Sequence, residues 1–207
     1  VPHIARLFDN VMEPPNDQVG PNVIFQFKFD EDTGRLSPNS PLRLDPGEGV
    51  GPRYYCFHPN LDIVYFSDEQ GCSVTGYNLD VSTGRLAAFQ TITTLPEGYA
   101  GRNTCSQIQV SPSGKFLYVP NRGHNSIAGF TLDPSNGHLT TIGQVPTEAV
   151  PNAFSLDPDG KFIVAVGSAS GGLASYRING DTGELTPLET FSVGRRPAGV
   201  LISNLGA

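Results

Sequence analysis

The sequence predicts an all-β protein, a β-propeller built of four-stranded blades. The main observation is a repeat of about 50 residues that is clearest from residue 51 onward. Each of three copies has a proline turn followed, 25 residues later, by a glycine turn: Pro59 and Gly84, Pro112 and Gly137, and Pro158 and Gly183. A period of about 40–50 residues with several short strands per unit is typical of propellers, which bind ligands near their axis on one face.

The composition fits this fold and excludes several partners. The 24 glycines and 18 prolines recur at regular offsets, as many tight turns require. The net charge of −7 argues against nucleic acid and anionic membranes as partners. No apolar run approaches the ~18 residues of a membrane span, and no signal peptide is visible at Val1. We therefore expect a cytoplasmic protein without a membrane segment.

The cysteines and histidines do not indicate a metal site. Cys56, Cys72 and Cys105 form no C-x-x-C pair, and there is no H-x-x-x-H motif or His/Asp cluster. The three thiols are interpreted as buried and reduced. No metal and no cofactor are expected.

Each unit is interpreted as a meander of four strands. In unit 51–98 the expected strands are Tyr54–Phe57, Ile63–Ser67, Val74–Leu79 and Arg85–Ile92. In unit 99–148 they are Thr104–Val110, Phe116–Val119, Ser126–Leu132 and His138–Val145. In unit 149–194 they are Ala153–Leu156, Phe162–Val166, Leu173–Ile178 and Glu184–Val193.

The two ends of the chain follow the repeat less closely. Unit 1–50 aligns at an offset of 50, with Ile4–Phe8 as its first strand. Its stretch Glu13–Asp17 is expected to be a loop, since two prolines remove two ladder donors. A closing strand, Gly199–Ser203, is expected within residues 195–207. Four units could close a small ring, but the unpaired last strand favours the C-terminal part of a longer, seven-bladed propeller.

Strand direction predicts one functional face. Since neighbouring strands run in opposite directions, the start of strand one and the end of strand two lie together, opposite the proline and glycine turns. The polar residues at these positions are His3, Arg53, Asp68, Glu69, Arg102, Arg122, His124 and Asn152. They differ between copies, as a single asymmetric site requires, whereas the turn residues are shared. His58, in a turn on the opposite side, is expected to cap that turn.

Four motifs resemble the lactonase family of seven-bladed propellers, which includes 6-phosphogluconolactonases and is related to fungal carboxymuconate cyclases. They are GPRYYCFHPN at 51–60, DEQ at 68–70, SPSGKFLYVPNRGHNSI at 111–127 and DPDGKFIVAVG at 157–167. By this resemblance Arg53 and Glu69 match the arginine of the family's GPRH and the acid of its NE motif. Arg102 and Arg122 match basic positions in later blades.

The chain also departs from the family. Tyr54 stands where the family has the histidine of GPRH, and Asn152 replaces the arginine of a later PR motif. The resemblance corresponds to the family's C-terminal four blades and closing strand, so the first three blades are not expected in this sequence.

The resemblance implies a hydrolase that opens a small anionic sugar lactone such as 6-phosphogluconolactone. Arginine offers paired charged donors to a phosphate, a carboxylate or an oxyanion. We expect Glu69, Arg53 and His124 to be catalytic, with Glu69 as general base and His3 or His124 as a substitute. Substrate binding is then expected from Arg102, Arg122, His3 and Asn152.

Other interpretations remain open. The protein could be a non-catalytic propeller that binds a ligand or a protein, or a carboxymuconate cyclase-like enzyme. Each arginine could form an inter-blade salt bridge, and Glu69 could simply pair with Arg53. Open blade edges leave oligomerisation as an option.

Overall fold

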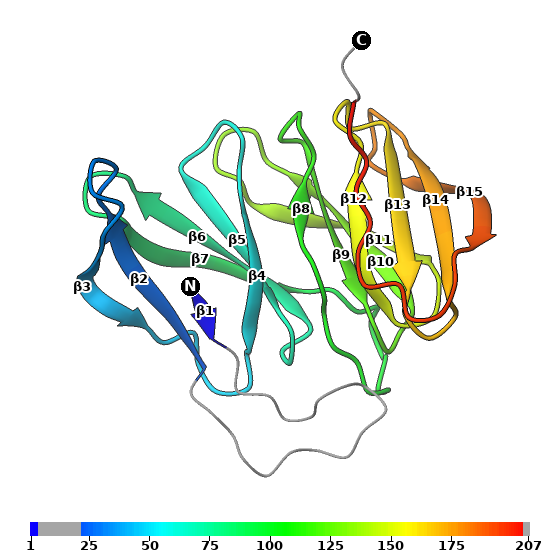
Figure 1. Cartoon of the computed structure of the whole chain (residues 1–207), viewed down its shortest axis with the longest axis horizontal. Helices are drawn as coiled ribbons and strands as arrows, with labels where there is room; N and C mark the ends of the chain where they lie inside the picture. The colour runs from blue at the N-terminus through cyan, green and yellow to red at the C-terminus, as the bar shows by residue number, and fades with distance from the viewer. Residues whose placement is uncertain (4–21, 205–207) are drawn as a thin grey trace.

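The computed structural model describes residues 1–3 and 22–204, which fold entirely as strands, turns and loops. Four antiparallel sheets follow one another along the chain, from the blue sheet at the left of Figure 1 to the orange sheet at the right. The first has three strands: β1 (Pro2–His3), β2 (Val23–Phe29) and β3 (Leu36–Leu44). In the described residues there is no helix, so none that could cross a membrane.

The next three sheets are four-stranded meanders, as predicted. The second is β4 (Pro52–Phe57), β5 (Ile63–Asp68), β6 (Ser73–Asp80) and β7 (Arg85–Thr93). The third is β8 (Gln109–Val110), β9 (Phe116–Asn121), β10 (Ser126–Leu132) and β11 (Leu139–Pro146). The fourth is β12 (Pro151–Leu156), β13 (Phe162–Gly167), β14 (Gly172–Ile178) and β15 (Leu185–Ser192).

The repeated glycine turn has one physical cause in every sheet. In the second sheet the Asp80 carboxylate accepts the N–H groups of Ser82 and Thr83, and the N–H of Gly84 returns to the Asp80 carbonyl. Gly84 adopts a left-handed φ of 70°, which a side chain would strain. The same turn forms at Asp30, Asp133 and Asn179. The spacing read from the sequence therefore reflects local turn chemistry.

The first strand predicted for the third unit is longer than the strand in the structure. Thr104–Val110 was expected as a continuous strand, but only Gln109–Val110 pairs regularly, with one isolated bridge from Cys105 to Asn121. Pro120 on the facing strand has no N–H, so it accepts from Ser106 but cannot return a bond. The ladder is consequently interrupted between the bridge and β8.

The two chain ends also differ from expectation. His3 was aligned with Arg53 on an innermost first strand, but β1 pairs directly with β2, in the place that β5 takes beside β6. The loop expected at Glu13–Asp17 and the strand expected at Ile4–Phe8 lie outside the described residues. The closing strand does not form over residues 199–203. Among the described residues no strand pairs with the tail, which runs along β12 and donates from the Ile202 N–H to the Ser155 hydroxyl at 3.1 Å.

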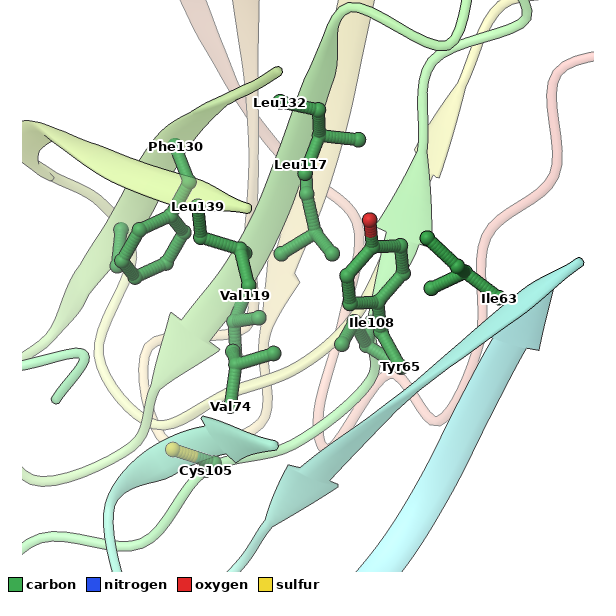
Figure 2. Close-up of a cluster of buried hydrophobic side chains, with 11 residues drawn as sticks. Ile63, Tyr65, Val74, Cys105, Ile108, Leu117, Val119, Phe130, Leu132 and Leu139 are labelled. Atoms are coloured by element: carbon green, nitrogen blue, oxygen red, sulfur yellow. The ribbon is translucent and has the colours of Figure 1, made fainter. Parts of the chain in front are cut away.

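The core lies between neighbouring sheets. Figure 2 shows the cluster between the second and third sheets, where Tyr65, Leu117, Val119 and Phe130 are fully buried. A second cluster around Phe154 and Ile163 joins the third and fourth sheets, and a smaller one around Ile24 joins the first and second. Because each interface is filled by apolar side chains, the sheets hold a fixed relative position. This packing brings polar residues of different units close together in space.

Candidate functional site

The site begins where β4 and β5 lie side by side. Pro52 is opposite Asp68 and Tyr54 is opposite Ser67, so Arg53 is an extra residue in a bulge at the start of β4. Glu69 follows the last residue of β5, and its N–H bonds the Gly51 carbonyl at 2.7 Å. The Arg53 Nη1 donates to Glu69 Oε1. The prediction that strand direction brings these two residues together is confirmed.

Arg122 reaches the same carboxylate from the third sheet. It follows the last residue of β9, its main-chain N–H bonds the Thr104 carbonyl at 2.9 Å, and its Nη2 donates to Glu69 Oε1 and to the Cys105 carbonyl. Arg122 and Glu69 are each 7% exposed, whereas the Arg53 side chain is 25% exposed. We call Arg53, Glu69 and Arg122 the arginine–glutamate cluster. It carries two positive charges and one negative charge, which suits an anionic ligand.

Burial lowers the pKa of Arg122 by removing its guanidinium from water, while the Glu69 carboxylate opposes this shift. The guanidinium keeps its charge, because arginine side chains are not deprotonated in proteins near neutral pH. The cluster therefore presents fixed positive charge in a place with little water.

Several polar atoms of the site have no hydrogen-bond partner within the part of the chain that the structure describes. Glu69 Oε2, Arg122 Nε and Thr104 Oγ1 are all buried in this state. Such groups are rare in folded proteins, because each costs the free energy of its lost hydration. An acceptor and two potential donors thus remain without a partner on Glu69, Arg122 and Thr104, as a site for a polar ligand would leave them.

Asp68 and Cys72 lie close to Glu69 in the sequence; Asp68 was predicted on the functional face without a catalytic or binding role, and Cys72 was interpreted only as a buried thiol. Asp68 is completely buried and accepts bonds from the hydroxyls of Ser73 and Thr75. Burial raises the pKa of Asp68 to about 6, more than these two hydrogen bonds lower it. A hydrogen bond from Cys105, with help from Asn103, lowers the pKa of the half-buried Cys72 thiol to about 7.

Strand direction placed Asp68 on the functional face, but nothing in the sequence showed that its carboxyl group is completely buried. Nothing in the sequence signals Cys72, because its partners Asn103 and Cys105 come from another unit.

The remaining predicted residues lie around the cluster. The His124 Nδ1 is 2.7 Å from the Ser126 hydroxyl, and its ring meets Tyr99 edge to face at 4.8 Å. Arg102 is exposed on the neighbouring loop, where its carbonyl accepts the Tyr99 hydroxyl. Within the described residues the ion pairs of Glu69 are with Arg53 and Arg122, and neither His124 nor Arg102 is among them.

Asn152 and His3, which were both predicted to bind substrate, take different positions in their sheets. Asn152 occupies a bulge of β12 between Pro151 and Ala153, the same place that Arg53 has in β4. His3 lies in β1, opposite Val23, and is not equivalent to Arg53. Asn152 therefore keeps its assignment to the functional face by position. The alignment of His3 with Arg53 is wrong, but His3 opposite Val23 takes the place that Asp68 has opposite Ser73, at the same end of the sheet.

His58 has the structural role expected of it. Its Nδ1 accepts the N–H groups of Asn60 and Leu61, which closes the proline turn. Its Nε2 lies 3.0 Å from the Gly114 carbonyl in the next sheet. No group of three or more His, Cys, Asp or Glu side chains gathers as metal ligands among residues 1–3 and 22–204.

Comparison with known proteins identifies the family to which this architecture belongs. Residues 17–202 match the family described as "Lactonase, 7-bladed beta-propeller". A 6-phosphogluconolactonase of Pectobacterium carotovorum is 34% identical over 82% of this chain, which covers 51% of that relative. The chain thus spans about half the length of the curated relatives it matches.

Two solved structures show the same fold. A protein from Lactobacillus plantarum has a TM-score of 0.78 and 30% identity over 84% of this chain and 50% of its own. The periplasmic gluconolactonase of Pseudomonas aeruginosa has a TM-score of 0.78 and 26% identity over 83% of this chain and 48% of its own. Together with the blade repeat and the meander sheets, these matches show that the chain belongs to the lactonase family of seven-bladed β-propellers.

Proposed function

We propose that the arginine–glutamate cluster is the centre of a lactonase-type hydrolase that opens a small anionic sugar lactone, with 6-phosphogluconolactone as the substrate. The observation that carries the proposal is one buried carboxylate held by two arginines from two sheets. The names of the relatives, 6-phosphogluconolactonase and gluconolactonase, support the reaction class.

The arginines supply recognition and charge stabilisation. Arg53 is the more exposed of the two, so its guanidinium is the one placed to meet an incoming phosphate or carboxylate. Arg122 is buried and held at its main chain, and its unpartnered Nε can donate to the oxyanion that forms when the lactone carbonyl is attacked.

Glu69 supplies the base. Its Oε1 is occupied by both arginines, while Oε2 has no partner in the described part of the chain. That oxygen accepts a proton from the attacking water as its hydroxyl adds to the carbonyl carbon. The ring C–O bond then breaks, the proton passes to the departing ring oxygen, and the product is the open hydroxy acid.

A second candidate is a non-catalytic module that binds an anion. It is favoured by the same contacts, because Glu69 already neutralises part of the arginine charge and ties both side chains in place. In this case the chain binds the sugar phosphate but does not turn over its lactone.

The test compares three variants of this chain in a lactone-hydrolysis assay that includes neutral lactones. Glu69→Gln should lower turnover by roughly 10²–10⁴-fold, and Arg53→Ala should mainly raise KM for the phosphorylated lactone. Lys161→Ala is the control, since Lys161 belongs to an exposed ion pair with Asp159. Unchanged kinetics in both site variants would remove the assignment. Binding of 6-phosphogluconate without any hydrolysis would favour the binding module.

A further inference from the structure

A buried asparagine lies directly beneath the loop that carries Arg122 and His124. Asn103 is 6% exposed and stands just before Thr104, on the segment that precedes β8. Its Oδ1 accepts the main-chain N–H of Gly123 at 2.9 Å and that of His124 at 3.0 Å. One side-chain oxygen thus holds two consecutive amides of the loop.

The nitrogen of the Asn103 side-chain amide also makes two hydrogen bonds. Asn103 Nδ2 donates to Asn121 Oδ1 at 2.9 Å and to the Cys72 sulfur at 3.3 Å. An amide has two donors and two acceptor sites, and all four are occupied here. Reversing the group would turn its N–H donors against the N–H groups of Gly123 and His124. The orientation of Asn103 is therefore determined by its partners.

The loop can take this position only because residue 123 is glycine. A Cβ on Gly123 would lie 1.8 Å from the Arg102 carbonyl oxygen, well inside van der Waals contact. The two main chains therefore touch, and the Asn103 side chain reaches over to the loop amides. With the bond from Arg122 N–H to the Thr104 carbonyl, the main chain is held on both sides of the Arg122 side chain.

The same network extends to the His124 ring. Asn121, which is completely buried, donates from Nδ2 to the Ser126 hydroxyl at 3.3 Å, and that hydroxyl is 2.7 Å from His124 Nδ1. Asn103 thus contacts the main chain of His124 directly and its ring through Asn121 and Ser126. A change at residue 103 should reach both candidate site residues of the loop.

We propose that Asn103 is a positioning residue that sets the Arg122 guanidinium against Glu69 and fixes the His124 ring. The proposal rests on the lactonase function proposed above. Asn103 itself needs no contact with substrate, because it acts through the loop 122–124. Replacing Asn103 should move the Arg122 guanidinium slightly away from its position against Glu69, while the sheets remain folded.

The experiment compares Asn103→Ala, Asn103→Asp and Asn39→Ala with the parent chain. Asn39 is the matched control. It is 7% exposed, and its amide donates to the Thr83 carbonyl and accepts from Ser40 N–H, in the turn region away from the site. Both alanine variants should lose a buried amide and a similar amount of thermal stability. Kinetics are measured well below the melting temperature of each variant.

Asn103→Ala should lower kcat/KM for 6-phosphogluconolactone by about 10²-fold, the effect expected of a misplaced catalytic group. Asn103→Asp should recover part of this loss, since a carboxylate oxygen still accepts from both loop amides. Asn39→Ala should leave kcat/KM unchanged. Equal kinetics in Asn103→Ala and the parent would overturn the proposal, and a partial recovery in Asn103→Asp would support it.

A second measurement does not depend on activity. The Arg122 Nε–H signal is followed by NMR and assigned through Arg122→Lys. It should shift or broaden in Asn103→Ala and stay in place in Asn39→Ala. If the parent chain hydrolyses no lactone but this signal responds, the proposed reaction fails and the positioning role stands. A signal that stays unchanged in Asn103→Ala contradicts the positioning role.

Discussion

The hydroxyl of Tyr65 donates a hydrogen bond of 2.7 Å to the main-chain carbonyl of Gly137, the turn glycine of the next sheet. Tyr118 makes the same bond, also 2.7 Å, to Gly183 one sheet further on. Both tyrosines are completely buried. A side chain on either glycine would collide with the facing sheet, since a Cβ on Gly137 would lie 2.4 Å from Ile63. The glycine turn therefore serves both its own hairpin and the contact between blades.

This contact predicts a measurable cost of removing one hydroxyl. Tyr118→Phe should lower the free energy of unfolding by about 1–3 kcal/mol, because the Gly183 carbonyl is left buried without its donor. Urea denaturation would measure the change. Tyr55→Phe is the control, since Tyr55 is 48% exposed and should change stability little. A Tyr118→Phe chain as stable as the parent would show that the carbonyl finds another partner.

The buried carboxyl of Asp68 predicts a pH dependence of stability. Its folded-state pKa of about 6 lies above the ordinary value of 3.8, mainly through burial. Between these values the folded state binds more protons than the unfolded state, so stability falls as pH rises through this window. Below pH 4 the penalty is absent, and above pH 6 it is fully present.

Asp68→Asn, which cannot ionise, should therefore gain stability relative to the parent as pH rises from 4 to 7. Two pKa units correspond to about 3 kcal/mol as an upper limit. The difference between the two unfolding free energies, measured in urea at each pH, checks this. Asp159→Asn is the control because Asp159 is exposed in its ion pair. A difference that does not change with pH would mean that Asp68 stays ionised in both states.

The three thiols should differ sharply in reactivity. A hydrogen bond from Cys105 lowers the pKa of Cys72 to about 7, whereas burial raises the pKa of Cys56 to about 12 and that of Cys105 well above its usual value. The thiolate is the reactive form, so iodoacetamide near pH 7.5 should alkylate Cys72 first. Peptide mass spectrometry would locate the adduct. Cys72→Ser should remove the fast phase, and early labelling of Cys56 would contradict the assignment.

The outermost sheets predict association of this chain in solution. Phe27 and Phe29 on the first sheet are 42% and 62% exposed, and Phe191 on the last is 50% exposed. Open blade faces of this kind favour contact with further sheets. Light scattering over a range of concentrations should show a mass that increases above that of one chain. Phe191→Lys should reduce this association, and Lys161→Ala, at an exposed ion pair, should not. A constant monomer mass would contradict the prediction.

The candidate site could be predicted in part. Strand direction alone brought Arg53 beside Glu69, because antiparallel neighbours must bring the start of β4 to the end of β5. It also brought Arg122 to the same face. It did not show that Arg122 shares one oxygen of Glu69, since that contact spans 53 residues and two sheets. The offset of 50 misplaced His3, because an alignment of units assumes that each strand takes the same place in its sheet.

The sequence by itself determined the blade repeat, the turns and most strand positions. These follow from local chemistry: Asp and Asn side chains bond their own turns, glycine adopts a left-handed φ, and proline interrupts ladders. Only the tertiary structure decided which polar residues meet, which stay without partners, and which are shielded from water. The buried position of Asp68, the neighbours of Cys72 and the four bonds of Asn103 all depend on residues from another strand or sheet. The reason is physical. Burial and the contacts of a side chain depend on how the sheets pack against one another, and the spacing of residues along the chain does not give the distances between sheets.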